Sequence, residues 1–371
     1  MLATDPNLTS RVGNNKKQPY RVLLMGPCIY WDDVGAGLLR REGLYCDIFS
    51  KTGWLTYILW AVRGRWRRYD VIYHISGIWS WLLSLILSMT GKPIIWHWIG
   101  SDVLYFKSGV PSHGLGGVVN RLTARMPSEI HIADSPEVAE ELGGIGIRAS
   151  VVRLLPERVE ADVRPLPPNL SVLSCWSDSR KDLYGGGLVL QLAQEFPNVE
   201  FKIAVATKDD EVSLRNVKFL GFQKDMEDIY DHSTVLVRVP EHDSLSAMVL
   251  EMLARGRYVI YNKELPGCHF AQNFEEAKKA LIEIMKLKEP NISGAQFVKE
   301  KFSVAGEAKK LAQICTGLAT KPVKPAQAAK VEVIAFTMRL MMCLLLIPAA
   351  FLLGLVRFYR FAKNHLLFLQ V

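Results

Sequence analysis

Two carboxylates in the C-terminal third of the chain are spaced in a way that suits ligand binding. Asp243 follows the apolar run TVLVRV, and Glu251 lies eight positions later, within LSAMVLEMLAR. The first run predicts a strand and the second a helix, which puts Asp243 in the loop between them and Glu251 about two turns into the helix. Unpaired backbone N–H groups at 244–247 and the helix dipole would favour an anion such as a diphosphate. Glu251 could then accept hydrogen bonds from ribose hydroxyls.

Spacing alone leaves a second interpretation open. Asp243 would then be the N-cap of an ordinary amphipathic helix, and Glu251 would lie on the exposed face of that helix. The choice between the two interpretations depends on the elements that position these residues.

Those elements follow a repeated alternation of apolar runs and helical patterns. Before residue 156, helices are predicted at 34–42, at 79–89 and after Ser135, and strands at 21–27, 69–76, 93–99, 129–134 and 151–155. After residue 168, helices are predicted at 187–195, 226–230, 245–255 and 274–286, and strands at 171–174, 200–205, 217–220, 234–239 and 258–261. Such alternation indicates parallel sheets with crossover helices.

The repeat predicts two doubly wound, Rossmann-like α/β domains. We place the N-terminal domain at 20–155 and the C-terminal domain at 169–325, joined by the proline-rich, charged linker 156–168. Residues 1–19 are polar and are expected to form a disordered tail. Ligands of doubly wound sheets bind beyond the carboxyl ends of the strands, so two facing domains are expected to form a cleft.

The run HDSLSAMVLEMLARGRYVIYNKELPG resembles the signature of the retaining glycosyltransferases of family four, which have the GT-B fold. That signature has two glutamates separated by seven residues; here Asp243 replaces the first and Glu251 matches the second. The resemblance implies that Glu251 binds the ribose of a nucleotide-sugar, that Asp243 contacts the donor sugar, and that backbone amides hold the phosphates. Those amides belong to Ser244, Leu245 and Ser246. Because aspartate reaches less far than glutamate, Glu241 is a candidate substitute for the sugar contact.

Other segments resemble the same family, and the likeness covers about residues 20–300. In NVKFLGF, the resemblance places Gly221 and Phe222 at the nucleotide base. Gly26, at the end of the first predicted strand, corresponds to a close backbone approach to the donor, with an ordinary turn glycine as the alternative. The family's Gly-Arg and Lys-Gly pattern is replaced here by DSRK, in which Arg180 or Lys181 could be the cation for the diphosphate. A solvated basic turn is the alternative there.

The segment HWIGSDV follows a predicted apolar strand, and in similar enzymes this loop lines the acceptor site and the reaction centre. His97 and Asp102 could each hydrogen-bond a sugar hydroxyl or the attacking group. For His97, the alternative is a core histidine with satisfied hydrogen bonds. Asp102 follows Gly-Ser and is expected in a loop.

Two segments point to a membrane. Residues 340–356 carry no charge, and 331–360 is expected to be a transmembrane or membrane-inserted helix, close to the short limit of about 20 apolar residues for a span. A buried terminal helix is the alternative. In 53–68, tryptophans precede four arginines, which suits an anionic membrane interface, although a domain helix with a basic outer face remains open. The expected membrane-surface residues are Trp54, Trp60, Arg63, Arg65, Trp66, Arg67 and Arg68.

The composition limits the classes of partner and cofactor that we expect. The formal net charge of +8 favours anionic partners. No recognition motif with interleaved aromatics accompanies the basic segment, so nucleic acid is not expected. No cysteine pair has CxxC spacing, the histidines form no metal-ligand cluster, and no Asp-x-Asp occurs. We therefore expect neither a metal nor another cofactor.

The resemblance and the membrane segments together imply a function. We expect a metal-independent, retaining glycosyltransferase that moves a sugar from a nucleotide-sugar donor to a hydroxyl of a glycan or lipid-linked acceptor. It would work in membrane-associated glycan or polysaccharide synthesis, with its catalytic domains in the cytoplasm. Two alternatives stay open: a sugar-nucleotide epimerase on the same fold, and a non-catalytic scaffold, which Asp243 in place of glutamate keeps in view.

Overall fold

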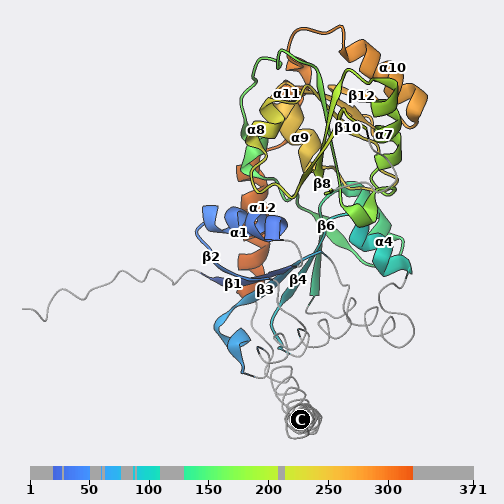
Figure 1. The fold of residues 1–371 in the computed structure, drawn as a ribbon. Coiled ribbons are helices and arrows are strands. Elements are labelled where there is room, and N and C mark those ends of the chain that lie inside the picture. The colour runs from blue at the N-terminus through green and yellow to red at the C-terminus, as the bar shows by residue number, and fades with distance from the viewer. Residues whose placement is uncertain are drawn as a thin grey trace, which may run out of the picture.

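The computed structural model describes residues 20–26, 29–50, 60, 63–76, 87, 90–108, 129–207 and 214–320. These residues form two α/β domains, each built on a six-stranded parallel sheet (Figure 1). This confirms the predicted pair of doubly wound domains. The predicted tail 1–19 and the predicted membrane helix 331–360 lie outside the described residues, as does the predicted helix 79–89 apart from Leu87.

The sheet of the N-terminal domain has the strand order β2-β1-β3-β4-β5-β6. Its strands are β1 (Arg21–Gly26), β2 (Tyr45–Ser50), β3 (Val71–Ile75), β4 (Ile94–Trp98), β5 (Glu129–Ala133) and β6 (Ala149–Val151). Its helical elements are α1 (Ile29–Arg41), the 3-10 helix η1 (Arg65–Arg68), α4 (Ser101–Ser108) and α6 (Pro136–Gly143). Strands β3 and β4 are buried at every position, which explains their continuous apolar runs. Ser135 is the N-cap of α6, and its hydroxyl accepts from the N–H of Val138, as the Ser-Pro start signal predicts.

The sheet of the C-terminal domain has the order β12-β11-β10-β7-β8-β9. Its strands are β7 (Ser171–Trp176), β8 (Glu200–Val205), β9 (Val217–Gly221), β10 (Val235–Arg238), β11 (Tyr258–Tyr261) and β12 (Cys268–Phe270). Its helical elements are η3 (Asp178–Arg180), α7 (Gly186–Glu195), α8 (Glu227–Asp231), α9 (Ala247–Ala254), α10 (Phe274–Ile284) and α11 (Ile292–Lys301). Each central element matches a predicted one to within a few residues.

Helices α4 and α11 were not predicted, and the other differences from the predictions fall mainly at sheet edges and helix starts. Strands β2 and β12 were not predicted; both are edge strands, whose mixed polar pattern gives a weak signal. Strand β6 ends at Val151, where the predicted strand begins. Helix α9 begins at Ala247 with Ser246 as its N-cap residue, so the interpretation of Asp243 as the N-cap is wrong.

The linker between the domains is fixed by two buried arginines rather than free to bend. It contains the 3-10 helix η2 (Glu157–Glu160). Arg255 donates to the carbonyl oxygen of Arg158 at 3.0 Å, and Arg257 donates to the carbonyl oxygens of Arg164 and Pro165 at 3.1 and 2.6 Å. A guanidinium group has several N–H donors in a fixed plane, so it can donate hydrogen bonds to several carbonyl oxygens of an extended chain.

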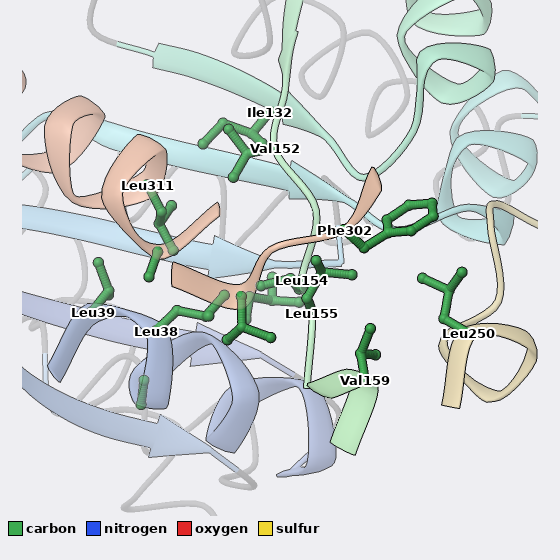
Figure 2. Packing of buried hydrophobic residues seen from close by; sticks show 14 of the residues in the cluster. Leu38, Leu39, Ile132, Val152, Leu154, Leu155, Val159, Leu250, Phe302 and Leu311 are labelled. Carbon is green, nitrogen blue, oxygen red and sulfur yellow. The ribbon is translucent and has the colours of Figure 1, made fainter. Parts of the chain in front are cut away.

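The last described helix, α12 (Val304–Ala319), follows the C-terminal domain in sequence but packs on α1 of the N-terminal domain (Figure 1). The predicted boundary of 169–325 did not anticipate this return. One hydrophobic cluster joins the two domains, and Figure 2 shows side chains of it from α1, α12, the linker and α9. Its labelled members include Leu39, Leu311, Val159 and Leu250.

Candidate functional site

The two sheets approach each other at the carboxyl ends of their strands. Ser244, in the loop between β10 and α9, donates its hydroxyl to the carbonyl oxygen of Ile99, directly after β4, at 3.0 Å. A Cβ on Gly100 would lie 3.1 Å from the backbone nitrogen of Ser244. Arg180, after β7, reaches Ser101 at the start of α4, with 3.5 Å between Nη1 and Oγ. The edges where ligands of doubly wound sheets bind are therefore in contact here.

The switch point of the C-terminal sheet falls between β7 and β10. The strands that follow β7 in the chain, β8 and β9, lie on one side of it, and β10, β11 and β12 lie on the other. The paired register of strands β7 and β10 ends with Leu236 opposite Leu173, although both strands continue further. Beyond that pair, Nη1 of Arg238 donates to the carbonyl oxygen of Cys175 at 2.9 Å. A charged side chain thus bridges the strands where the backbone ladder stops.

Asp243 lies at this switch point, in the loop that connects β10 to α9. Its Oδ2 accepts two hydrogen bonds from Arg238, from Nε at 3.1 Å and from Nη2 at 2.5 Å. Lys263 donates from Nζ to the Asp243 carbonyl oxygen at 2.9 Å. Oδ1 accepts no hydrogen bond from any described residue, and the Asp243 side chain is 13% exposed. One oxygen of this carboxylate is therefore available to a ligand.

Glu251 has different surroundings, because its side chain is only 1% exposed. Its Oε1 accepts from Arg158 Nε at 3.1 Å and from the Tyr30 hydroxyl at 3.3 Å. Its Oε2 accepts from the hydroxyl of Tyr230. The donors come from α1, the linker and α8, so Glu251 joins the two domains and the segment between them. The interpretation that places Glu251 on an exposed helix face is wrong.

The charges around Glu251 are balanced inside the protein. Burial raises the pKa of Glu251, and the neighbouring Arg158 guanidinium opposes that rise. Burial lowers the pKa of Arg158, but the interactions with Glu251, Tyr30 and Tyr230 together outweigh this and the net shift is upward. Burial, with the Glu251 charge beside it, raises the pKa of Tyr30 and of Tyr230. The arrangement is an ion pair that two neutral hydroxyl donors complete.

The start of α9 offers backbone donors, as the sequence predicts. No described residue accepts a hydrogen bond from the N–H of Leu245 or of Ala247, and Ser246 makes no side-chain cap. The Tyr261 hydroxyl donates to the carbonyl oxygen of Ser244 at 3.1 Å, which holds the loop in place. The amides of Leu245 and Ala247 therefore lie without partners among the described residues in the position where a helix start favours an anion.

His97 is fully buried in β4, beneath the loop that carries Ser244. Its Nδ1 lies 2.6 Å from the Tyr73 hydroxyl oxygen, and its Nε2 lies 4.0 Å from Oδ1 of Asp134. Burial lowers the pKa of His97 to about 3, which keeps the ring neutral. Asp134 accepts from the Leu154 N–H at 2.8 Å and from the Ser244 hydroxyl at 3.5 Å. His97 is therefore a core histidine, but not one with all its hydrogen bonds satisfied, because its buried Nε2 has no hydrogen-bond partner among the described residues.

Asp102 lies in the first turn of α4, so the expectation that it lies in a loop is wrong. Its Oδ1 accepts from the N–H groups of Gly100 at 2.9 Å and Val103 at 3.1 Å, and its Oδ2 accepts from Ile99 at 3.1 Å. Burial raises its pKa to about 6, against the lowering effect of these bonds. The carboxylate is used to close the turn that starts the helix, which is a common role for aspartate.

Arg180 and Lys181 follow β7 on the other side of the switch point, and both are partly exposed. Thr207 fixes this turn, because its N–H and hydroxyl donate to the two carboxylate oxygens of Asp178 at 2.9 and 2.8 Å. The Arg180 guanidinium carbon lies 5.4 Å from the ring centroid of Tyr105, on α4. Arg180 thus extends across the junction between the two domains.

Gly221 and Phe222 lie at the carboxyl end of the edge strand β9. Gly221 has φ of 64°, a left-handed conformation that favours glycine. Phe222 follows with 69% of its surface exposed, an unusual degree for a phenylalanine. An exposed ring at this edge could stack on a nucleotide base.

Gly26 ends β1, and its lack of a side chain leaves room for Asp32. A Cβ on Gly26 would lie 2.0 Å from Oδ1 of Asp32. Asp32 is fully buried, and neither of its carboxylate oxygens has a hydrogen-bond partner among the described residues. Burial raises the pKa of Asp32 to about 7, and the charge of Asp33 adds to that rise. The proposed backbone approach of a donor to Gly26 stays a prediction.

The segment expected at a membrane surface divides into two groups. Trp60 and Trp66 are 4% and 6% exposed and pack in a core cluster of the N-terminal domain, so their assignment to a membrane surface is wrong. The 3-10 helix η1 turns Trp66 inward, and the arginines take the outer side. These exposed arginines are Arg63, Arg65, Arg67 and Arg68. Trp54 lies outside the described residues.

Among the residues that the structure describes, no helix is both long and apolar enough to cross a membrane. The same residues contain no group of three or more His, Cys, Asp and Glu side chains that could hold a metal ion.

Sequence reasoning missed the residues that surround the two carboxylates. Arg238 left a usable signal, since an arginine inside the apolar run TVLVRV is a buried charge that needs a partner nearby. Arg158 and Tyr30 left none, because they lie far from Glu251 in sequence. Their pairing depends on how the domains pack.

Comparison with solved structures establishes the fold. Sucrose-phosphate synthase from Thermosynechococcus elongatus is similar with a TM-score of 0.63 and 13% identity, over 81% of this chain and 99% of that chain. HepE from Anabaena, in complex with UDP and glucose, is similar with a TM-score of 0.59 and 14% identity, over 80% and 99% of the two chains. UDP-N-acetylglucosamine 2-epimerase from Rickettsia bellii is similar with a TM-score of 0.51 and 12% identity, over 81% and 97%.

These likenesses show that the chain has the GT-B fold, as the resemblance of its signature implies. At such low identities, they speak for the architecture alone. No family model and no curated protein sequence matches the chain.

Proposed function

We propose that this protein is a glycosyltransferase that moves a sugar from a nucleotide-sugar donor to a hydroxyl acceptor. One observation carries the proposal: the loop at the switch point of the C-terminal sheet is bonded to the carboxyl edge of the N-terminal sheet, through Ser244 and Ile99 at 3.0 Å. A donor held at this loop would lie against the other domain, where a second substrate can approach its sugar. The similar fold of HepE, whose structure contains UDP and glucose, supports this placement.

The diphosphate, sugar and base of the donor each have a proposed partner near the loop between β10 and α9. The diphosphate would accept from the free amides at the start of α9, with Arg180 or Lys181 as the cation. The sugar would meet the free oxygen of Asp243, and the base would lie near Phe222. Charge that develops on the leaving diphosphate would be stabilised by the same amides and cation without a metal. Retention of the anomeric configuration is proposed from the resemblance of the signature alone.

Glu251 remains a proposed ligand of the ribose, on the condition that a ribose hydroxyl replaces one of its present hydrogen-bond partners. Both of its oxygens already accept hydrogen bonds from within the protein. Tyr30 makes the longer bond to Oε1, at 3.3 Å, and is the partner that a ribose hydroxyl could replace most easily. Arg158 would then stay as the counter-charge of Glu251.

The acceptor would approach from the N-terminal domain, where His97 and Asp102 lie. His97 and Asp102 are buried and bonded within the N-terminal domain, so we propose that they shape the floor beneath the Ser244 loop instead of touching the acceptor. A glycan or a lipid-linked glycan remains the proposed acceptor.

A panel of nucleotide-sugars tests the proposed reaction. UDP-glucose, UDP-N-acetylglucosamine, GDP-mannose and ADP-glucose would each be incubated with the full-length chain, and release of the nucleotide diphosphate would be measured. We expect release with at least one donor and, with an accepted acceptor, a product whose anomeric proton shows retention by NMR. A product with inverted anomeric configuration would contradict the retaining mechanism but not the proposed transferase activity.

The epimerase alternative is kept because the Rickettsia bellii epimerase has a similar fold. An epimerase changes the sugar of UDP-N-acetylglucosamine without an acceptor. Appearance of the epimeric sugar in the panel, without an acceptor-linked product, would favour that alternative over transfer.

We further propose that the protein works at a membrane, with its two domains in the cytoplasm. The support is the uncharged segment within 331–360 and the exposed arginines of the N-terminal domain. Sedimentation with membranes would be compared between the full chain and a chain that ends at residue 330. We expect only the full chain to pellet; equal pelleting would move the attachment to the arginines.

A further inference from the structure

Asp243 is held at both its side chain and its backbone. Arg238 binds the carboxylate through two nitrogens, and both bonds end on the same oxygen, Oδ2. Lys263 binds the backbone carbonyl of Asp243. This one-sided arrangement is notable because a guanidinium commonly binds a carboxylate through two parallel bonds to two oxygens. Here it leaves Oδ1 without a partner among the described residues, in a carboxylate that cannot turn freely.

Arg238 itself has little freedom to leave this position. Only 9% of its side chain is exposed, and its remaining nitrogen donates to the carbonyl oxygen of Cys175. Its guanidinium carbon lies 4.3 Å from the ring centroid of Tyr184. Burial lowers the pKa of Arg238, but the interactions with Asp243, Cys175 and Tyr184 together outweigh this and the net shift is upward, so the group stays charged. A buried cation of this kind depends on its one anionic partner.

A role for Arg238 as a ligand of the diphosphate is the rival explanation. To bind a phosphate, Arg238 would have to give up Asp243, which would leave that carboxylate unpaired and near the buried Asp134. Arg180 is a more exposed cation at the same switch point, and its hydrogen bond goes to the neutral hydroxyl of Ser101, so it meets no such obstacle. The contacts therefore favour a pair that stays together while the donor binds.

We propose that Arg238 is a positioning residue: it grips Oδ2 of Asp243 so that Oδ1 faces a hydroxyl of the donor sugar. The inference rests on the proposed transferase function and adds a residue that the resemblance does not supply. It also gives a physical account of the aspartate, since a shorter side chain must be held in place to make a contact that a longer one could reach. The guanidinium further offsets repulsion between Asp243 and the donor's phosphates.

The test separates binding of the nucleotide from turnover. Arg238→Met, Arg238→Lys, Asp243→Asn and the double variant Arg238→Met/Asp243→Asn would be made in the full-length chain. The control is Arg164→Met, an exposed linker arginine whose pair with Asp231 lies on the surface. Binding of UDP, GDP and ADP would be measured by calorimetry, and kcat and KM would be measured with the donor that the wild type uses.

We expect Arg238→Met to lower kcat by about 30- to 100-fold, as a misplaced catalytic contact does, while the nucleotide Kd stays within about threefold of wild type. Retained nucleotide binding also shows that the variant is folded. Arg238→Lys should fall between Arg238→Met and wild type, because it keeps the charge but not the two-nitrogen grip. The double variant should lose no more than the worse single variant, since both changes remove one contact.

Two results would overturn the inference. A nucleotide Kd that rises in parallel with the loss of kcat would make Arg238 a phosphate ligand. A kcat in Arg238→Met as high as in Arg164→Met would show that Asp243 needs no positioning, or is not used. A wild type that turns over no donor would instead overturn the proposed function and, with it, the role of Arg238.

Discussion

Asp243 and Glu251 are eight residues apart in one sequence signature, yet their surroundings are opposite. The Asp243 side chain is 13% exposed and keeps one oxygen free of protein partners, whereas the Glu251 side chain is 1% exposed and accepts bonds on both oxygens. Asp243 is the residue that departs from the family pattern, and Glu251 is the one that matches it. A match in residue type therefore does not show that a carboxylate is available to a ligand.

The difference has a physical origin in where each residue lies. Asp243 is in a loop at the end of a sheet, and Arg238 reaches it from the strand just before. Glu251 points from the middle of α9 toward elements from both domains, where burial of an ionised group requires several donors. Asp243 therefore keeps an oxygen that a ligand could reach, whereas Glu251 links residues of the two domains.

The largest effect on stability should come from the Glu251 region. Arg158→Met would leave Glu251 buried without its cation, which costs about 3–5 kcal/mol for pairs of this kind. The matched control Arg164→Met removes an arginine whose side chain is 50% exposed, and such surface pairs contribute only about 0–1 kcal/mol. Urea unfolding would compare the two variants. Equal losses would show that Glu251 does not depend on Arg158.

The sequence could predict the central strands, the helices between them and the two-domain repeat. It could do so because buried parallel strands are continuous apolar runs, and Ser135 with Pro136 marks a helix start. It could also place Asp243 and the amides after it at the loop. The edge strands β2 and β12, the start of α4 at Asp102 and the return of α12 to α1 were missed.

The missing part of the site depends on contacts between distant residues. Tyr30 and Arg158 meet Glu251 across more than 90 positions of sequence, and no local pattern records such a meeting. The tryptophans Trp60 and Trp66 show the same limit, because aromatic residues next to arginines suit a membrane interface and a basic-edged core equally well. Arg238 is the exception, since its charge inside an apolar run was visible.

The dependence of stability on pH should reveal the contribution of the buried Asp134 beneath the Ser244 loop. Burial raises the pKa of Asp134, which lies under the Ser244 loop, from 3.8 to about 7. Between these values the folded protein keeps a proton that the unfolded chain has lost, so this stabilisation is complete below about pH 3.8 and is lost as the pH rises toward about 7. Asp134→Asn should remove a slope of up to about 1.4 kcal/mol per pH unit. An unchanged slope in urea unfolding between about pH 4.5 and about pH 7 would contradict this assignment.

The smallest expected effect sharpens the role of Glu251 in ligand binding. Tyr30→Phe removes the longer of the two bonds on Oε1 and leaves Arg158 in place. If a ribose hydroxyl replaces Tyr30, the variant should bind the nucleotide about 2- to 10-fold more tightly, which corresponds to one hydrogen bond. Calorimetry with UDP, GDP and ADP gives the comparison. Weaker binding would make Tyr30 a ligand itself, and unchanged binding would place the ribose elsewhere.

The central claim is that a nucleotide-sugar reacts at the loop between β10 and α9, with Asp243 on its sugar. The most direct test measures release of nucleotide diphosphate from the donor panel by the wild type and by Asp243→Asn, with nucleotide binding measured on both. We predict release by the wild type, a loss of about 100-fold in the variant, and nucleotide binding that stays within about threefold. Equal release by the two proteins, or no release from any donor, would contradict the claim.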